Sequence, residues 1–322
     1  MKKLLATAAA AALFAAAAIG AWTYEGKWGT YGAGDGQFKN AYGVAVAPNG
    51  TVYVADGGNC RIQYFTATGS YLGKWGSRGT ETGQFDYPTG VAVSPLNGNV
   101  YVAERNNTRV QYFTATGSFL GEWGSEGWGN GQFIGPWGVN VSPLSGNVYV
   151  ADADGDRVEY FTASGSYLGR WGSSGPGNGR FYGPACAAVA PGDNIYVADS
   201  GNCLIQYFTA TGSYLGVWGS SGTGNSQFQN PTGVACCGDN VYVADSWNNR
   251  IQYFNYLGSY LGQWGSLGSG NGQFHFPYAL GINASGNRIY VVDSFNNRIQ
   301  YFNRNEPSVT PASLGRLKAV FH

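Results

Sequence analysis

The chain has 322 residues, of which 18 are basic and 18 acidic, with 52 glycines and an aromatic content of 16%. Charged residues make up only 11%, against about 25% in an average globular protein, and the absence of a basic run argues against nucleic acid as a partner. Low charge together with many aromatic residues argues against a disordered chain, and the many glycines indicate many turns, so composition predicts an all-β protein.

The first 20 residues have the composition of a secretory signal peptide. Lys2 and Lys3 precede an apolar run over residues 4–19, and a small residue, Gly20, stands at its end. This pattern predicts export and cleavage, which leaves 16 basic and 18 acidic residues, a net charge of −2. An uncleaved membrane anchor is the alternative. We therefore expect a secreted, cell-surface or periplasmic protein with no membrane span after cleavage.

A short element recurs six times along the rest of the chain. One copy is TVYVADGGNCRIQYF (residues 51–65) and another is NVYVADSWNNRIQYF (residues 240–254). An acidic residue marks each copy, and these residues follow one another at steps of 46 to 48: Asp56, Glu104, Asp152, Asp199, Asp245 and Asp293. A period of about 40–50 residues is typical of one propeller blade.

Each period predicts four short strands. In the second period these are GVAVSP (90–95), NVYVA (99–103), RVQYF (109–113) and SFLGEWG (118–124), separated by turn-forming residues. Both alternating sets of side chains in NVYVA are apolar or aromatic. Both faces of the sheet should therefore be buried, as in a blade packed between two neighbours.

The two ends of the repeat region are offset. The segment YEGKWG (Tyr24–Gly29) matches the fourth strand of a period, whereas the last period ends at Phe302 without a fourth strand. We predict that Tyr24–Gly29 pairs with Arg298–Phe302, which completes the last blade and closes the ring.

The repeated element N-x-Y-V-A-D-S-x-N-N-R-I-Q-Y-F, preceded by F-x-x-P-x-G-V-A-V, resembles the NHL repeat over Tyr24 to Phe302. The resemblance implies a six-bladed β-propeller of four-stranded antiparallel blades, spanning residues 22–303. The WD40 repeat is the competing propeller unit, but QYF stands where its Trp-Asp dipeptide would end the third strand. Cytosolic members of the NHL family bind RNA or protein, and exported members resemble sensor domains, adhesive surface modules and an amidating lyase.

An acidic residue and an arginine five positions later bracket the turn between the second and third strands in five periods. The pairs are Asp56/Arg61, Glu104/Arg109, Asp152/Arg157, Asp245/Arg250 and Asp293/Arg298. Because the pair recurs so regularly, we predict an ion pair that clamps each turn, not a ring of ligand-binding charges. Function is then expected where the periods differ.

Large aromatic residues occupy variable positions in the loops that should surround one mouth of the central channel. They are Tyr42, Trp128, Trp137, Trp247, Tyr278 and Phe295. Exposed aromatics on a rigid rim favour a binding surface, for a surface protein or for the flat face of a glycan. The alternative is that some of them fold back and plug the channel.

The third period contains Asp152, Asp154 and Asp156 at alternate positions. Clustered carboxylates can hold Ca²⁺, but the glycine spacing of a calcium loop is missing and Asp is common in turns. A calcium site is therefore the secondary interpretation, and no cofactor is expected.

Five cysteines leave at least one thiol unpaired within the chain. Cys186 replaces a first-strand glycine in the irregular fourth period, and we predict a disulfide between Cys186 and Cys203. Cys60 is expected to be the lone thiol. Cys236 and Cys237 are adjacent, which strains a disulfide, so they should be free or paired between molecules.

These features predict a non-enzymatic binding or scaffold module with no catalytic residues. The lyase branch of the NHL family uses zinc held by several histidines, whereas His275 is the one histidine before the C-terminal tail. A metal-dependent lyase or lactonase in the channel mouth, and a structural component of a surface layer or filament, are the alternatives. The tail, residues 304–322, is predicted to be a frayed terminus, with docking or anchoring as alternatives.

Overall fold

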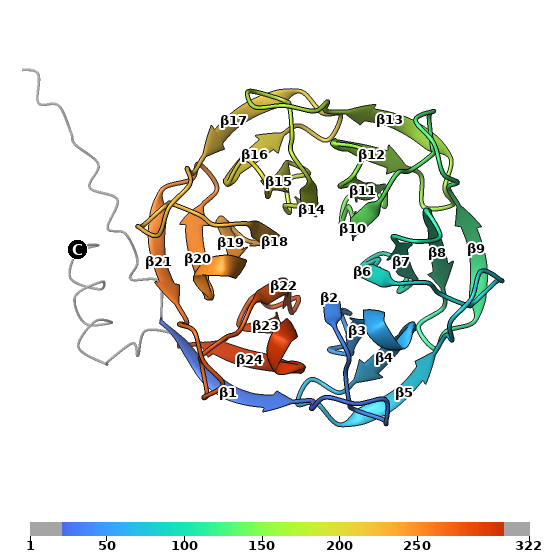
Figure 1. Cartoon of the computed structure of the whole chain (residues 1–322), viewed down its shortest axis with the longest axis horizontal. Coiled ribbons are helices and arrows are strands. Elements are labelled where there is room, and N and C mark those ends of the chain that lie inside the picture. The colour runs from blue at the N-terminus through green and yellow to red at the C-terminus, as the bar shows by residue number, and fades with distance from the viewer. Residues whose placement is uncertain (1–20, 306–322) are drawn as a thin grey trace, which may run out of the picture.

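The protein is a ring of six four-stranded antiparallel sheets around a central channel, as the sequence predicts (Figure 1). The computed structural model describes residues 21–305. The predicted signal peptide and all but the first two residues of the predicted tail lie outside the described residues. Within residues 21–305, no helix is long and apolar enough to cross a membrane.

Five blades each consist of four consecutive strands, numbered from the channel outwards. Blade 1 contains β2 (Ala41–Val46), β3 (Val52–Asp56), β4 (Arg61–Phe65) and β5 (Tyr71–Trp75). Blade 2 contains β6 (Pro88–Val93), β7 (Val100–Glu104), β8 (Arg109–Phe113) and β9 (Phe119–Trp123). Blade 3 contains β10 (Pro136–Val141), β11 (Val148–Asp152), β12 (Arg157–Phe161) and β13 (Tyr167–Trp171). Blade 4 contains β14 (Pro184–Val189), β15 (Ile195–Asp199), β16 (Leu204–Phe208) and β17 (Tyr214–Trp218). Blade 5 contains β18 (Pro231–Cys237), β19 (Asn240–Asp245), β20 (Arg250–Asn255) and β21 (Tyr260–Trp264).

Blade 6 joins the two ends of the repeat region. It contains β22 (Pro277–Ile282), β23 (Arg288–Asp293), β24 (Arg298–Arg304) and, outermost, β1 (Trp22–Trp28). Tyr24 lies opposite Phe302 and Trp28 lies opposite Ile299, which confirms the predicted closure. The pairing extends beyond the prediction to Trp22 opposite Arg304.

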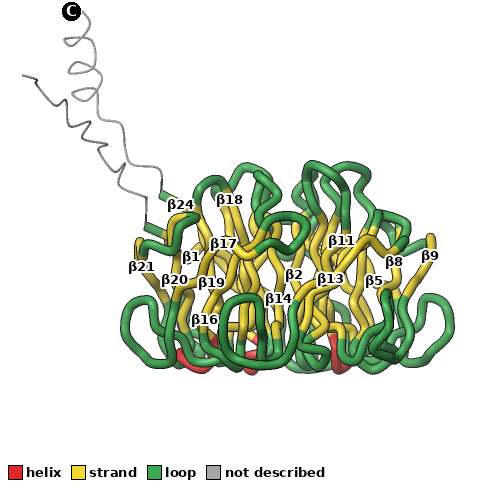
Figure 2. The backbone as a smooth tube through the Cα atoms, turned by 90° about the horizontal axis from the view of Figure 1, so that it is seen from above, coloured by secondary structure: helices red, strands yellow, loops and turns green. Residues whose placement is uncertain are grey.

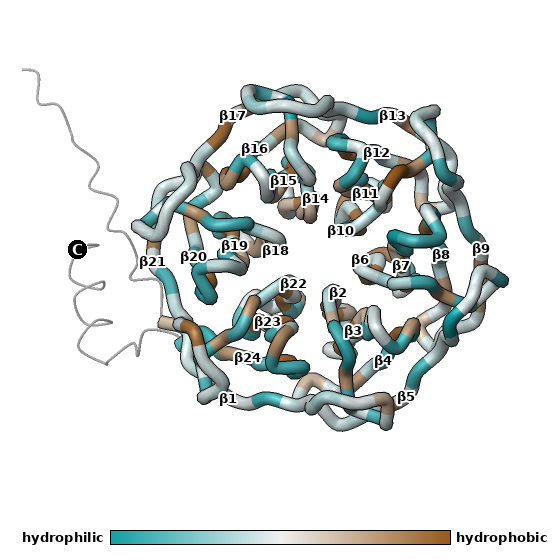
Figure 3. Tube along the Cα trace, viewed as in Figure 1, coloured by the Kyte–Doolittle hydropathy of each residue, from teal (hydrophilic) through white to brown (hydrophobic). Residues whose placement is uncertain are grey.

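The hydrophobic core lies between the blades. In β7, Val100 and Val102 pack against blade 1, whereas Tyr101 and Ala103 pack against blade 3, and all four are buried. Figure 3 shows hydrophobic segments in the inner strands of the ring, such as β6 and β14. Burying one large apolar side chain stabilises the folded state by about 1.5–3 kcal/mol. Alternate residues along such a strand therefore face the two neighbouring blades, and both sets are apolar or aromatic.

The predicted ion pairs are present in five blades, with nitrogen–oxygen distances of 2.6–2.9 Å. In blade 1, Asp56 accepts hydrogen bonds from Arg61 Nε (2.7 Å) and from the backbone N–H of Lys39 (2.8 Å). The Arg61 guanidinium also donates to backbone carbonyls of Ala33 and Gly34. Each pair therefore fastens the turn between the second and third strands to the long connection that precedes its blade.

The long connections and the clamped turns gather on one face of the ring. Figure 2 shows this face below the strands, marked by three short helical turns: η1 (Gly57–Asn59), η2 (Ser246–Asn248) and η3 (Ser294–Asn296). We call it the loop face. It consists of the six connections at residues 29–40, 76–87, 124–135, 172–183, 219–230 and 265–276, and the six turns at residues 57–60, 105–108, 153–156, 200–203, 246–249 and 294–297.

Candidate functional site

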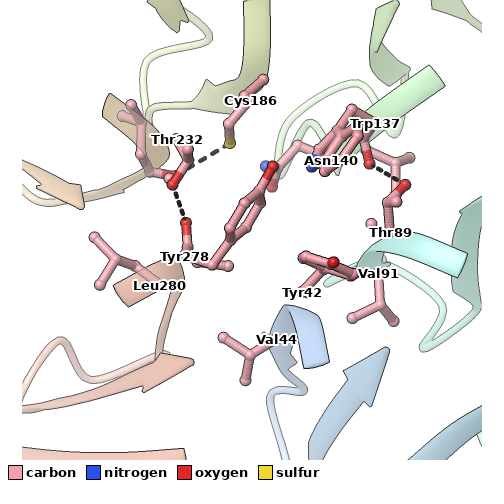
Figure 4. A pocket seen from close by; sticks show the side chains of 18 residues that line it. Tyr42, Val44, Thr89, Val91, Trp137, Asn140, Cys186, Thr232, Tyr278 and Leu280 are labelled. Carbon is pink, nitrogen blue, oxygen red and sulfur yellow. Dashed lines mark hydrogen bonds between the residues drawn. The ribbon is translucent and has the colours of Figure 1, made fainter. Parts of the chain in front are cut away.

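Three predicted ligand-binding residues meet in the channel. Tyr42, Trp137 and Tyr278 are each the second residue of an innermost strand, and their ring centroids are 5.0–5.8 Å apart (Figure 4). All three are half-buried. Burial raises the pKa of both the Tyr42 and Tyr278 hydroxyls, so both stay protonated at neutral pH. These side chains plug the channel, as the alternative interpretation of the sequence states, and we call them the aromatic plug.

The plug is held from the loop face. The Arg105 guanidinium lies 4.8 Å from the centroid of the Trp137 ring, a cation–π contact. Arg105 also donates hydrogen bonds to Asp154 Oδ2 at 2.8 and 3.2 Å. The hydroxyls of Tyr42 and Tyr87 share a hydrogen bond of 2.5 Å. Contacts from blades 2 and 3 therefore fix the orientation of the plug.

The three aspartates of blade 3 do not form a cation site. Asp152 pairs with Arg157 at 2.9 Å, and Asp154 pairs with Arg105. Asp156 accepts a hydrogen bond of 2.8 Å from the backbone N–H of Gly183 in the next connection. Each carboxylate serves a different partner, and no three His, Cys, Asp or Glu side chains in the described part of the chain gather to hold a metal.

The other three predicted aromatics project from the loop face. Trp128, Trp247 and Phe295 are 64%, 63% and 56% exposed. Phe295 stacks on Phe276 at 4.9 Å and meets the edge of His275 at 5.0 Å. The Arg157 guanidinium lies 5.6 Å from the centroid of the Trp128 ring. The variable aromatics therefore divide into a plug at the channel axis and exposed rings farther out.

Blade 4 lacks aromatic side chains at both variable positions. Ala185 occupies the position of the plug residues, and Gly201 occupies the position of Trp247 and Phe295. Both small residues line a hollow of about 380 Å³ at blade 4, with Trp137, Asp154, Tyr182, Ser200, Asn230 and Tyr278 among its other lining residues. We call it the inner hollow, because innermost-strand residues contribute to its wall.

A second hollow of about 310 Å³ adjoins the first. It is lined by Cys203, Ser221, Gln229 and Trp247, and it shares Ser200, Gly201 and Asn230 with the inner hollow. We call it the outer hollow, and the two together the blade-4 groove. Of the predicted ligand-binding residues, Trp137, Tyr278 and Trp247 line this groove, whereas Tyr42, Trp128 and Phe295 do not.

Sequence analysis missed several groove residues, namely Tyr182, Ser200, Ser221, Gln229 and Asn230. The signal that could have found them is the irregularity of the fourth period, in which small residues replace aromatics at two loop positions. Asn230 and Gln229 directly precede an innermost strand, and Tyr182 stands one period earlier in the matching connection. Their convergence depends on the ring geometry.

The groove is nearly neutral and amphipathic. Asp154 is the one charged side chain that lines it, and Arg105 neutralises that charge. Trp137, Tyr182 and Trp247 supply aromatic surface, while the amides of Asn230 and Gln229 supply hydrogen-bonding groups. Such a lining suits a neutral ligand that has both apolar and hydroxyl-rich surfaces.

The channel behind the plug is too narrow for such a ligand. It is lined mainly by aliphatic side chains such as Val91, Val139 and Leu280, with Asn140 as a lone amide (Figure 4). The cavity at the plug is about 50 Å³, and the cavity farther along the channel, lined by residues such as Val46, Val93 and Ile282, is about 140 Å³. Both are much smaller than either hollow of the blade-4 groove and suit water molecules. The blade-4 groove is therefore the candidate site.

The predicted disulfide between Cys186 and Cys203 is wrong. Both cysteines are free, as are Cys60, Cys236 and Cys237. The Cys186 thiol is directed at the Val234 carbonyl of blade 5 (3.5 Å), whereas the Cys203 thiol contacts Ser200 O within its own turn (3.7 Å). Burial raises the pKa of Cys186 to about 11, so this thiol stays protonated.

Two family descriptions match the chain. The NHL repeat matches residues 38–65, 85–113 and 181–208, and a family described as a 6-bladed beta-propeller matches residues 223–309. These matches and the ring topology show the class of the protein: it is a six-bladed β-propeller. More specifically, it is a propeller that contains NHL repeats. No curated protein matches the chain.

Several solved structures share the fold. A streptogramin B lyase structure is 15% identical with a TM-score of 0.62, over 88% of this chain and 98% of that one. Hydrazine synthase from Kuenenia stuttgartiensis is 13% identical with a TM-score of 0.59, over 83% and 96%. A chain from a nidogen/laminin complex is 17% identical with a TM-score of 0.56, over 70% and 80%. At these identities the similarity shows the fold alone.

Proposed function

We propose that the protein is a non-enzymatic binding module that takes a neutral carbohydrate in the blade-4 groove. The observation that carries the proposal is the groove itself, in which the small residues Ala185 and Gly201 lie between the aromatic side chains of Trp137, Tyr182, Tyr278 and Trp247. A sugar ring presents C–H groups that pack on aromatic faces, and hydroxyls at its edge that pair with amides. Export, which the N-terminal residues predict, would bring the module to extracellular or envelope glycans.

Several polar groups of the groove are available to accept or donate hydrogen bonds to a ligand. Asp154 Oδ1 makes no hydrogen bond within residues 21–305, because Arg105 binds Oδ2. The side chains of Asn230 and Gln229 likewise make no hydrogen bonds within these residues, so both amides are available to a ligand. We expect Tyr182, which is 45% exposed, to supply a platform in the inner hollow.

An enzyme is the second candidate, since the streptogramin B lyase structure has the same fold. The lining of the groove favours binding over catalysis. A zinc-assisted lyase needs about three protein ligands, and the groove lining holds one carboxylate, one thiol and no histidine. Metal analysis of the purified protein would separate the candidates, because stoichiometric Zn²⁺ or Ca²⁺ would support the enzyme.

A glycan array with a matched pair of variants tests the proposal. Tyr182→Ala should abolish or strongly weaken every saccharide interaction detected with the wild-type protein. Tyr31→Ala is the control, because Tyr31 is a 67% exposed tyrosine on the loop face outside the groove. The proposal fails if no saccharide binds the wild-type protein, or if both variants bind equally well.

A further inference from the structure

We infer that the blade-4 groove holds the end of an extended chain of neutral pyranose units, with the terminal unit in the inner hollow and the next units in the outer hollow. This inference rests on the proposed function and names the form of its ligand. It depends on three observations: the two hollows share three lining residues, the aromatic plug lines the inner end of the groove, and the outer end carries an exposed indole.

The continuity of the hollows depends on Gly201. A Cβ atom at this position would lie 2.8 Å from Tyr182 Cβ and 2.9 Å from Tyr182 O, closer than real contacts allow. A side chain at position 201 would therefore force Tyr182 to shift, and the N–H of Gly201 is already bonded to Tyr182 O at 2.8 Å. Gly201 lines both hollows. Because no side chain rises from the turn here, one ligand can lie across both hollows.

The inner end of the groove stops at the aromatic plug. Trp137 and Tyr278 form this wall, and their centroids are 5.7 Å apart. Arg105 covers Trp137 and is itself tied to Asp154, so the wall is fixed on the side of blade 3. The inner hollow takes its lining from blades 3 to 6, without residues of blades 1 and 2. A chain that lies along the groove would therefore meet the plug at its inner end.

The outer end of the groove opens along the seam between blades 4 and 5. Ser221 and Gln229 belong to the connection that leads into blade 5, which lies farther from the channel than the innermost strands. Trp247 stands at this end with 63% of its surface exposed. A ring so exposed, beside a hollow already lined by amides and hydroxyls, provides a stacking surface for units that follow the terminal one.

The chemistry of the groove limits the ligand class. The one charged lining residue is neutralised by Arg105, so a uronic acid or sulfated chain has no cationic partner in the groove. The aromatic walls require rings with apolar faces. A chain of neutral hexopyranoses or N-acetylhexosamines satisfies both conditions.

Calorimetric titration with oligosaccharide ladders tests the inference. The probes are glucose and N-acetylglucosamine with their β-1,4-linked oligomers of two to six units, with the α-1,4-linked glucose oligomers for comparison. We expect the affinity for one of these ladders to rise about tenfold from one to three units and then to stay level. For the corresponding polymer, the number of binding sites should increase in proportion to chain ends when the polymer is shortened.

Trp247→Ala should remove the gain with length while leaving the affinity for the single sugar unchanged. Trp128→Ala is the matched control, because Trp128 is equally exposed on the same face outside the groove and should keep the full gain. Equal affinity for one and six units, or a site number independent of chain ends, would overturn the inference while leaving carbohydrate binding intact. Failure of the wild-type protein to bind any sugar would overturn both proposals.

Discussion

Glu159 Oε1 lies 2.9 Å from Arg157 Nε, in a position where the other five blades carry glutamine. In blade 1 that glutamine, Gln63, donates to Asp56 and to the backbone carbonyl of Gln37. An ionised Glu159 cannot donate, so two fully buried carboxylates, Asp152 and Glu159, face one guanidinium. Burial raises the pKa of Glu159, and the charge of Asp152 raises it further.

We predict that Glu159→Gln stabilises the protein at neutral pH. A raised pKa means that the folded state binds more protons than the unfolded state, so stability falls as pH rises from the unfolded value of about 4.3 through the folded pKa. Replacing Glu159 by glutamine removes this loss of stability and restores two hydrogen bonds. Together these effects should raise the free energy of unfolding by about 1–3 kcal/mol at pH 8. Urea denaturation from pH 5 to pH 8 should show that the free energies of unfolding of the wild-type and Glu159→Gln proteins diverge as pH rises. Parallel profiles would contradict the prediction.

Blade 4 offers a second test of the clamp. Leu204 replaces the clamping arginine, and Asp199 is fully buried without an ion pair among the described residues. Its carboxylate keeps only hydrogen bonds from neutral groups, such as Asn202 and Gln206, and burial raises its pKa.

Leu204→Arg should therefore stabilise the fold by about 1–3 kcal/mol, the usual gain from hydrogen bonds to a charged group. The gain should be largest at neutral pH and should shrink in acid, as the raised pKa of Asp199 lets its carboxylate take up a proton in the folded state. The reverse change in blade 5, Arg250→Leu, should cost about 3–5 kcal/mol because it strands a buried charge. Differential scanning calorimetry at pH 5 and pH 7.5 would measure both effects, and a destabilised Leu204→Arg protein would refute the role assigned to the clamp.

Ring closure by β1 yields a third prediction. Trp22 is 9% exposed and stacks on Trp264 of blade 5 at 5.9 Å, so the closing strand joins two blades. Trp22→Ala should cost about 3–5 kcal/mol. Removal of residues 22–28 should lower the melting temperature further, because it leaves the edge of β24 unpaired. An exposed aromatic control, Trp128→Ala, loses a cation–π contact with Arg157 that is worth about 0.5–1 kcal/mol, so its melting temperature should fall much less than that of Trp22→Ala. If the truncated protein has the same melting temperature as the wild type, closure by β1 does not stabilise the ring.

The sequence predicts the scaffold well because each scaffold feature repeats. The acid–arginine clamp recurs in five periods, and the offset of one fourth strand is sufficient to predict that Tyr24 pairs near Phe302. Such features depend on neighbours within one blade, where spacing along the chain translates directly into register.

The site is harder to predict because it depends on distances across the ring. Trp137 and Trp247 both follow from variable loop positions, yet one lies at the channel axis and the other projects into solvent. The reason is that Trp137 is the second residue of an innermost strand, whereas Trp247 lies on the turn between the second and third strands of its blade. Cys186 and Cys203 likewise share a blade, but their thiols face different neighbours, which no spacing reveals.

The fixed orientation of the plug leads to the last prediction, which rests on the proposed function. Arg105 contacts Trp137 and Asp154 but is itself 37% exposed, so its ion pair should contribute little to stability, about 0–1 kcal/mol. Arg105→Ala frees the wall of the inner hollow and leaves Asp154 unneutralised in the groove. We therefore expect saccharide affinity to fall about tenfold or more while the melting temperature stays nearly constant. Lys74→Ala, which removes a comparably exposed ion pair with Asp35 away from the groove, should change neither quantity. Equal affinities for the Arg105→Ala and Lys74→Ala proteins would show that the plug does not shape the site.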